Sequence, residues 1–188
     1  MKTIVDIFSK FRNALQKNDV HRVQLAHALR AMALSFIGVY IPIYLLHLGY
    51  ALADVIYFRI SFHTFGLFFG YAVIVPLMRH WGMIRVFRLY FPLEVAFLVL
   101  LHSFPSLDFS YFWIALIGGA ATFAYWMPLN ILFLKASREK KMGRDLALLF
   151  ALPKVLGIGG PLMSAALIPL YGFLPMFIVA IIGLALAF

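Results

Sequence analysis

Long apolar runs alternate with short polar connections along the whole chain, and this alternation predicts its secondary structure. The apolar runs lie at residues 31–53, 55–78, 86–104, 109–134 and 146–188. A helix needs about 20 residues to cross a hydrocarbon core of about 30 Å. The last run is too long for one helix, and Pro169, Gly172 and Pro175 divide it into two. The pattern therefore predicts an all-α, polytopic membrane protein with six transmembrane helices.

Positive charges follow the same alternation. The segment before the first apolar run carries six Lys or Arg, the connection at residues 79–88 carries three, and the connection at residues 135–145 carries five. The three connections between these carry none. Arg88 lies where the connection 79–88 overlaps the start of the next apolar run, and the two remaining cations, Arg59 and Lys154, lie inside apolar runs. Because Lys and Arg are enriched in cytoplasmic loops, we expect a multi-pass protein of the cell membrane with its N-terminus in the cytoplasm.

Composition supports the membrane assignment and excludes several other classes. The chain is 64% hydrophobic and 12% charged, whereas soluble domains carry about 25% charged residues. A net charge of +9 would point to nucleic acid in a soluble protein. Here the cations lie in the connections, so membrane topology explains them and we expect no nucleic-acid partner. The absence of cysteine excludes disulfides and thiolate chemistry.

The pattern divides the chain into an N-terminal arm, residues 1–27, and a transmembrane bundle, residues 28–188. In the arm, apolar residues recur at helical spacing, which predicts an amphipathic helix on the cytoplasmic membrane surface. These residues are Ile4, Ile7, Phe8, Phe11 and Leu15. The last apolar run has no polar anchor after it. We therefore expect the bundle to be a fragment of a twelve-helix protein.

Three short motifs occur at defined places in this pattern: a basic connection centred on glycine, a Gly- and Pro-rich run, and a glycine-led aromatic stretch. They comprise Arg79, Gly82 and Arg85 in the second connection, Gly157, Gly160 and Pro161 in the fifth predicted helix, and residues 171–177 at the start of the sixth. Together they resemble signature motifs in the N-terminal six-helix half of major facilitator superfamily transporters. The acidic residue of the family's loop motif would fall at Arg79, and the fourth-helix arginine of its drug antiporters is missing from residues 116–121.

The resemblance implies secondary active transport of an unidentified small molecule by alternating access, with two six-helix bundles rocking around a midplane site. It implies as partners the lipid bilayer, a missing C-terminal half or a second copy of the chain, and a coupling proton. The basic loop and the Gly-Pro run would then serve conformational change and packing.

Ionisable residues inside the predicted spans are candidates for the substrate or coupling-ion pathway, because each costs at least about 2.5–3.5 kcal/mol at the bilayer centre. Arg59 and His63 share a helix face. Arg59 could instead be an interfacial anchor that extends to the membrane surface. Glu94 and Lys154 lie at equal depth, about 12–13 Å from the inner ends of their helices, so they could form a buried ion pair. Alternatively, Glu94 could carry a proton.

Polar and aromatic residues on the first and fourth predicted helices are further pathway candidates, because the resemblance places these helices on the central path. They are Tyr40, Tyr44, Tyr125, Trp126 and Asn130. The alternative is that the aromatic residues face lipid or pack between helices. We expect the small residues 118–121 and 157–165 to let helix backbones approach closely.

Signatures of enzymes are absent from the sequence, which contains no phosphate-binding loop, His-Glu-x-x-His or Gly-x-Ser-x-Gly. The six histidines are dispersed without metal-ligand spacing. We therefore expect no enzyme activity, no cofactor and no metal site. The alternatives to a carrier are a non-transporting membrane scaffold or assembly protein, and a half-size transporter that acts as a homodimer.

Overall fold

A computed structural model of the chain describes residues 19–106 and 110–188. Throughout this part the regular structure is helical and contains no strand, as expected. Four helical segments are long and apolar enough to cross a membrane, namely Val20–His47, Leu52–Trp81, Tyr111–Ala136 and Glu139–Tyr171. The all-α membrane class is thus confirmed. Most of the expected amphipathic arm lies outside the described residues.

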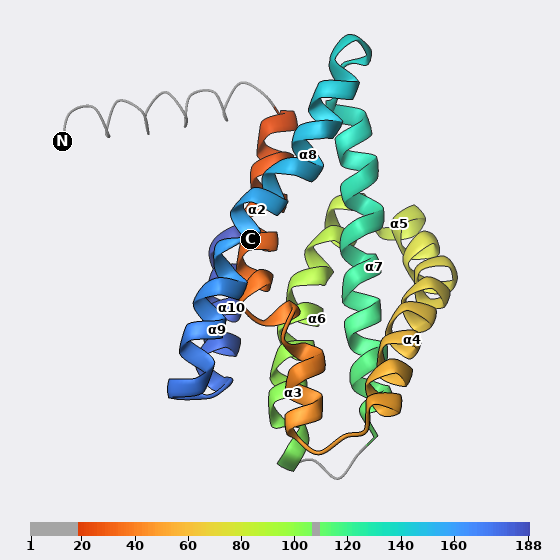
Figure 1. Cartoon of the computed structure of the whole chain (residues 1–188). Helices are drawn as coiled ribbons and strands as arrows, with labels where there is room; N and C mark the ends of the chain where they lie inside the picture. The colour runs from red at the N-terminus through yellow and green to blue at the C-terminus, as the bar shows by residue number, and fades with distance from the viewer. Residues whose placement is uncertain (1–18, 107–109) are drawn as a thin grey trace, which may run out of the picture.

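The helices follow one another with short connections (Figure 1). In chain order they are α2 (Asp19–Gly38), α3 (Ile41–His47), α4 (Leu52–Phe69), the π-helical segment η1 (Gly70–Ile74), α5 (Val75–Trp81), α6 (Met83–Ser103), η2 (Phe104–Ser106), α7 (Tyr111–Ala136), η3 (Glu139–Lys141), α8 (Met142–Gly157), α9 (Gly159–Tyr171) and α10 (Leu174–Ala187). The break expected between Pro169 and Pro175 is present, because α9 ends at Tyr171 and Gly172 adopts a φ of +72°.

The first helix continues across the boundary expected between an arm up to residue 27 and a span starting at residue 31. It runs without interruption from Asp19, and the candidate membrane segment starts at Val20. Some polar side chains of its first half have partners inside the bundle. Gln24, for example, is buried and donates from Nε2 to the Asp145 carbonyl oxygen at 2.8 Å.

Some prolines lie next to irregular points of the long segments, because a proline cannot donate a hydrogen bond to the carbonyl four residues before it, whereas the prolines inside α6, α7 and α8 interrupt no helix. Pro42 follows the break between α2 and α3, and Pro161 follows the break between α8 and α9. Pro76 directly follows the π-helical turn of η1, which the sequence did not reveal. Prolines and π-helical turns are common causes of kinks in helices.

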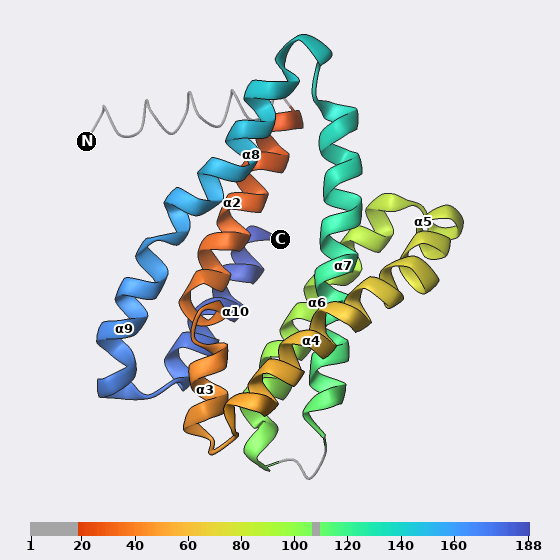
Figure 2. The same ribbon diagram turned by 45° about the vertical axis from the view of Figure 1, so that its right-hand side comes forward.

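The helices form two groups that lie side by side in both views (Figures 1 and 2). In the first group, α2 packs against α8, α9 and α10. In the second, α7 packs against α4 and α6. Contacts of α10 with α6 and of α2 with α7 join the two groups.

Glycines allow these helices to approach closely, as expected for the two small-residue patches. A Cβ on Gly119 of α7 would lie 2.4 Å from the Phe62 carbonyl oxygen of α4. A Cβ on Gly160 of α9 would lie 1.9 Å from the Ser35 Oγ of α2. Any side chain at these positions would push the helices apart, so the expectation of close packing is confirmed.

Candidate functional site: a buried ion pair between two cavities

An ion pair between Arg30 of α2 and Glu94 of α6 lies deep inside the bundle. Nη2 of Arg30 donates to Oε2 of Glu94, and the two side chains are only 7% and 6% exposed. Each residue follows the first residue of its helix by eleven positions, which is about 16 Å along the axis. Because a charge removed from water is costly, each of these buried side chains requires the other as a partner.

Aromatic rings hold the guanidinium of Arg30 in place. Its central carbon lies 3.8 Å from the ring centroid of Tyr125 and 5.5 Å from that of Tyr90. The Tyr125 hydroxyl in turn forms a 2.7 Å hydrogen bond with Nδ1 of His27. The His27 ring meets the Trp126 ring edge-on at 5.1 Å. Cation–π contacts of this kind strengthen when the cation is removed from water.

The cluster around Arg30 contains one unsatisfied hydrogen-bond donor. Nε of Arg30 is buried and has no hydrogen-bond partner among the residues that the structure describes. A buried donor without a partner costs about 1–3 kcal/mol, more when it is charged. Arg30 thus has a remaining capacity to bind an acceptor.

A cavity of about 230 Å³ lies on one side of the ion pair, between α2, α4, α6 and α7. We call it the central cavity. Its polar lining comes from Arg30, Arg59, Glu94 and Thr122, and Trp126 adds an indole. The remaining lining is apolar: Leu34, Ile37, Gly38, Ile41, Phe58, Phe62, Phe97 and Leu98.

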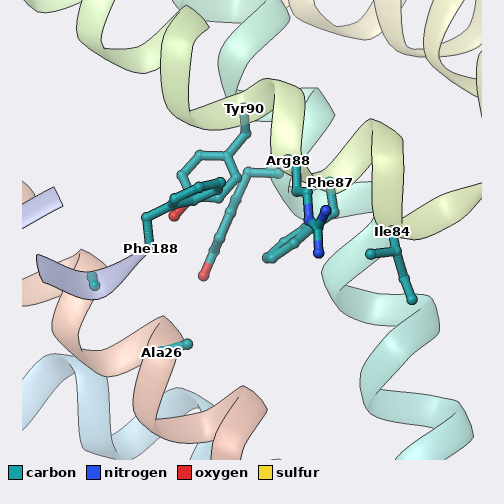
Figure 3. A pocket seen from close by; sticks show the side chains of 8 residues that line it. Ala26, Ile84, Phe87, Arg88, Tyr90 and Phe188 are labelled. Carbon is teal, nitrogen blue, oxygen red and sulfur yellow. The ribbon is translucent and has the colours of Figure 1, made fainter. Parts of the chain in front are cut away.

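A second cavity, of about 360 Å³, lies on the other side of the ion pair, toward the start of α6. We call it the basic-end cavity. Figure 3 shows the rings of Phe87, Tyr90 and Phe188 around it, with Arg88 beside them and Ala26 facing them from α2. Tyr90 and Tyr125, which hold Arg30, are among its lining residues. The ion pair and its two tyrosines therefore separate the two cavities.

Glu94 and Lys154 do not form the ion pair that their equal depth in the predicted spans allowed. Glu94 pairs with Arg30, and Lys154 is exposed on α8. The physical reason is the packing order, because α8 packs along α2, whereas α6 packs along α7 and α10. Arg30 was missed because it directly precedes the apolar run at residue 31, where it reads as a cation of the polar arm.

The other ionisable and polar candidates divide between the cavity and the surface. Arg59 is exposed and lines the central cavity. His63 is exposed beside Phe62, with ring centroids 5.3 Å apart. Asn130 is exposed, and its Nδ2 donates to the Trp126 carbonyl oxygen at 2.9 Å. Of these three residues, only Arg59 lines the same cavity as Glu94.

The tyrosine candidates of the first span hold helices together. The Tyr40 hydroxyl donates to the Pro161 carbonyl oxygen at 2.8 Å, and the Tyr44 hydroxyl to the His102 carbonyl oxygen at 3.1 Å. Neither residue lines the central cavity. Tyr125 and Trp126 are different, because they contact the ion pair or the cavity directly.

The residues of the resemblance motifs lie away from the ion pair. Arg79, Gly82 and Arg85 line a shallow depression together with Lys135 from the end of α7. Gly82 adopts a φ of +85°, which lets α6 start directly after α5. Gly157 and Gly160 face Ser35 of α2, with Gly160 in the tighter contact. We call the end of the bundle that carries the depression the basic end.

In the part of the chain that the structure describes, no three His, Asp or Glu side chains come close enough together to hold a metal ion. Comparison with protein-family models, curated proteins and solved structures gives no match to this chain. The residues and their geometry therefore carry the functional argument.

Proposed function

We propose that the protein is a secondary active transporter of the cell membrane, which moves a small molecule by alternating access. Its six spans would follow the apolar runs, with the N-terminus and the basic end in the cytoplasm. The observation that carries the proposal is the Arg30–Glu94 pair, buried between two cavities. The central cavity would open to the outer side, and the basic-end cavity to the cytoplasm.

The physical argument is that a buried ion pair contributes little to stability compared with well-packed apolar residues. Charged residues inside membrane segments commonly mark substrate or ion pathways. Here the pair and its tyrosines close off one cavity from the other, which is what a carrier needs at the centre of its path. Breaking and re-forming the pair would couple ligand binding to movement of α2 against α6.

The helix packing also supports this proposal. The first helix of the chain's first half, α2, packs against α8, α9 and α10 of its second half. The first helix of the second half, α7, packs against α4 and α6 of the first half. This packing, in which the first helix of each half lies against helices of the other half, is expected of two inverted three-helix repeats, as in the six-helix half of major facilitator transporters. A missing C-terminal half or a second copy would complete the path.

Side-specific labelling tests the proposal, and the chain, which has no cysteine, suits the method. Single cysteines at Leu34 and Ala26 report on the central and the basic-end cavity. A membrane-impermeant maleimide should label Leu34→Cys from outside and Ala26→Cys from inside. Adding Glu94→Gln removes the Arg30–Glu94 pair that lies between the two cavities. The rate of labelling should then rise at one position and fall at the other. If Glu94→Gln leaves both labelling rates unchanged, the non-transporting scaffold is the better description.

A further inference from the structure

We infer that the central cavity binds a small organic anion, whose carboxylate lies between Arg59 and Arg30 and whose apolar body lies against the aromatic wall. This names the substrate class of the carrier proposed above and rests on that function for the step of transport. Binding itself depends only on the cavity. Three observations carry the inference: the charge of the lining, an unpaired donor, and the shape and polarity of the walls.

The charge of the cavity lining is unbalanced. Among the described residues, the lining contains two guanidinium groups, those of Arg30 and Arg59, and one carboxylate, that of Glu94. Glu94 is neutralised by Arg30, whereas Arg59 forms no ion pair within the described residues. One positive charge of the lining, that of Arg59, therefore remains without a counter-charge in the cavity. A ligand with a single negative charge would balance it.

The unpaired donor belongs to Arg30, which is a lining residue of the same cavity. Nε of Arg30 is buried without a partner in residues 19–106 and 110–188, although Nη2 is bound to Glu94. Guanidinium groups are suited to carboxylates because their donors point in a fixed planar fork. This nitrogen lies beneath the cavity surface, so a carboxylate oxygen in the cavity bonds it when the Arg30 side chain turns toward the ligand.

The walls favour an aromatic or branched apolar body. Phe58, Phe62, Phe97 and Trp126 supply aromatic surface, and Thr122 adds one hydroxyl. The volume of about 230 Å³ lies just below the range of about 300–1,000 Å³ that is usual for small-molecule pockets. A monocarboxylate of the size of phenylacetate matches this space, whereas a lipid or a peptide does not.

A cationic ligand does not fit the same lining. It would have to displace Arg30 from Glu94 and would then lie between two arginines. A neutral ligand would leave the charge of Arg59 and the Nε donor of Arg30 as they are. The anion is thus the class that both observations favour.

Binding can be measured on the purified chain in detergent, without any gradient. Three probes share the aromatic body and differ in charge, namely phenylacetate, 2-phenylethanol and benzylamine. We expect phenylacetate to raise the midpoint of thermal unfolding with increasing concentration and to give a titration isotherm of one site. Equal or greater stabilisation by benzylamine or 2-phenylethanol would overturn the inference.

Variants of Arg59 then locate the site. This residue is exposed, so Arg59→Gln should fold like the original protein, which its unfolding midpoint without ligand checks. We expect Arg59→Gln to weaken phenylacetate binding about tenfold or more, since it removes a charged hydrogen-bond donor. Arg59→Lys should retain part of the affinity because it keeps the charge. Arg138→Gln, at an exposed residue of the basic end, is the matched control and should bind normally. Unchanged binding by Arg59→Gln would contradict the inference.

Uptake of labelled phenylacetate into proteoliposomes separates this inference from the proposed function. Binding together with uptake supports both. Binding without uptake would contradict the carrier and support the anion site. The labelling response of the Leu34→Cys and Ala26→Cys proteins without any phenylacetate binding would contradict the anion site and support the carrier.

Discussion

Arg30 and Glu94 differ from the other ion pair in the described residues by their environment. Nη2 of Arg144 lies 3.4 Å from Oδ1 of Asp145; the Arg144 side chain is 63% exposed, whereas that of Asp145 is 7% exposed and also accepts a hydrogen bond from the Ser137 hydroxyl. Because water surrounds the Arg144 guanidinium and Asp145 keeps a second partner, we expect this pair to contribute at most about 1 kcal/mol, as exposed pairs do. In a buried pair, removal of one partner leaves an uncompensated charge, which costs about 3–5 kcal/mol. Single substitutions can therefore distinguish the two environments.

We expect Glu94→Gln to lower the free energy of unfolding by about 3 kcal/mol, because it leaves the buried Arg30 without its counterion. The double variant Arg30→Met with Glu94→Leu should recover most of this loss, since it removes both charges together. Thermal unfolding in detergent measures both effects, and Arg144→Gln is the control, with a loss of at most about 1 kcal/mol. A double variant less stable than Glu94→Gln would show that the pair itself stabilises the fold.

The two roles of Tyr125 can be separated by substitution. Tyr125→Phe keeps the ring under Arg30 and removes the hydroxyl that bonds His27, so we expect a loss of about 1 kcal/mol. Tyr125→Leu also removes the cation–π contact and the aromatic packing, and we expect a loss of about 3 kcal/mol. Chemical denaturation of the two variants side by side measures the difference. Equal losses would mean that the ring contributes nothing through its contact with Arg30.

At the scale of helices, proline and glycine determine where the elements break and touch. The breaks near Pro42 and Pro161 and between α9 and α10 were predictable, because each follows from a missing donor or from a glycine at positive φ. The π-helical turn before Pro76 was not, because the same proline could equally have produced a simple kink. The burial of Gln24 in the first half of α2 was not predictable, because its partner, the Asp145 carbonyl oxygen, is distant in the sequence.

Adjacent glycines of α9 provide a matched pair for testing helix contact. We expect Gly160→Ala to destabilise the protein by about 1–3 kcal/mol, because its Cβ would overlap Ser35 of α2. A Cβ on Gly159 meets nothing within 4 Å, so Gly159→Ala should be neutral or stabilise by up to about 1 kcal/mol. Thermal unfolding of both variants gives the comparison. If Gly160→Ala were as stable as Gly159→Ala, α9 and α2 would not pack as described.

At the scale of the whole molecule, the sequence revealed the membrane class and part of the site, but not which helices are neighbours. Glu94 and Arg59 stood out because charged residues inside apolar runs are rare, and both line the central cavity. The partner of Glu94 was not predictable. Lipid chains are as apolar as helix surfaces in a membrane, so hydrophobicity does not determine which helices pack against one another. The pairing of α2 with α6 across the cavity is a tertiary property.

The orientation in the membrane stays a prediction that labelling can test. Lys140 and Ala51 are exposed and lie at opposite ends of the predicted spans, so single cysteines at these positions report on the two sides of the membrane. We expect a membrane-impermeant maleimide to react with Lys140→Cys only in inside-out vesicles and with Ala51→Cys only in right-side-out vesicles, since the cations stay in the cytoplasm. Permeabilised vesicles, in which both must react, are the control. The reverse pattern would invert the topology.

The π-helical turn of η1 has a consequence for the arginines that follow it. A π turn contains one residue more than an α turn, so it acts as a single-residue insertion in the α4–α5 segment. Deletion of the exposed Val73 would remove this extra residue and leave the downstream residues on the same helix faces. If all residues were kept in a regular α-helix without the π turn, everything downstream would be rotated by about 100°. Arg79 would then turn away from Lys135, and the shallow depression that they share would disappear without the loss of any of its own residues.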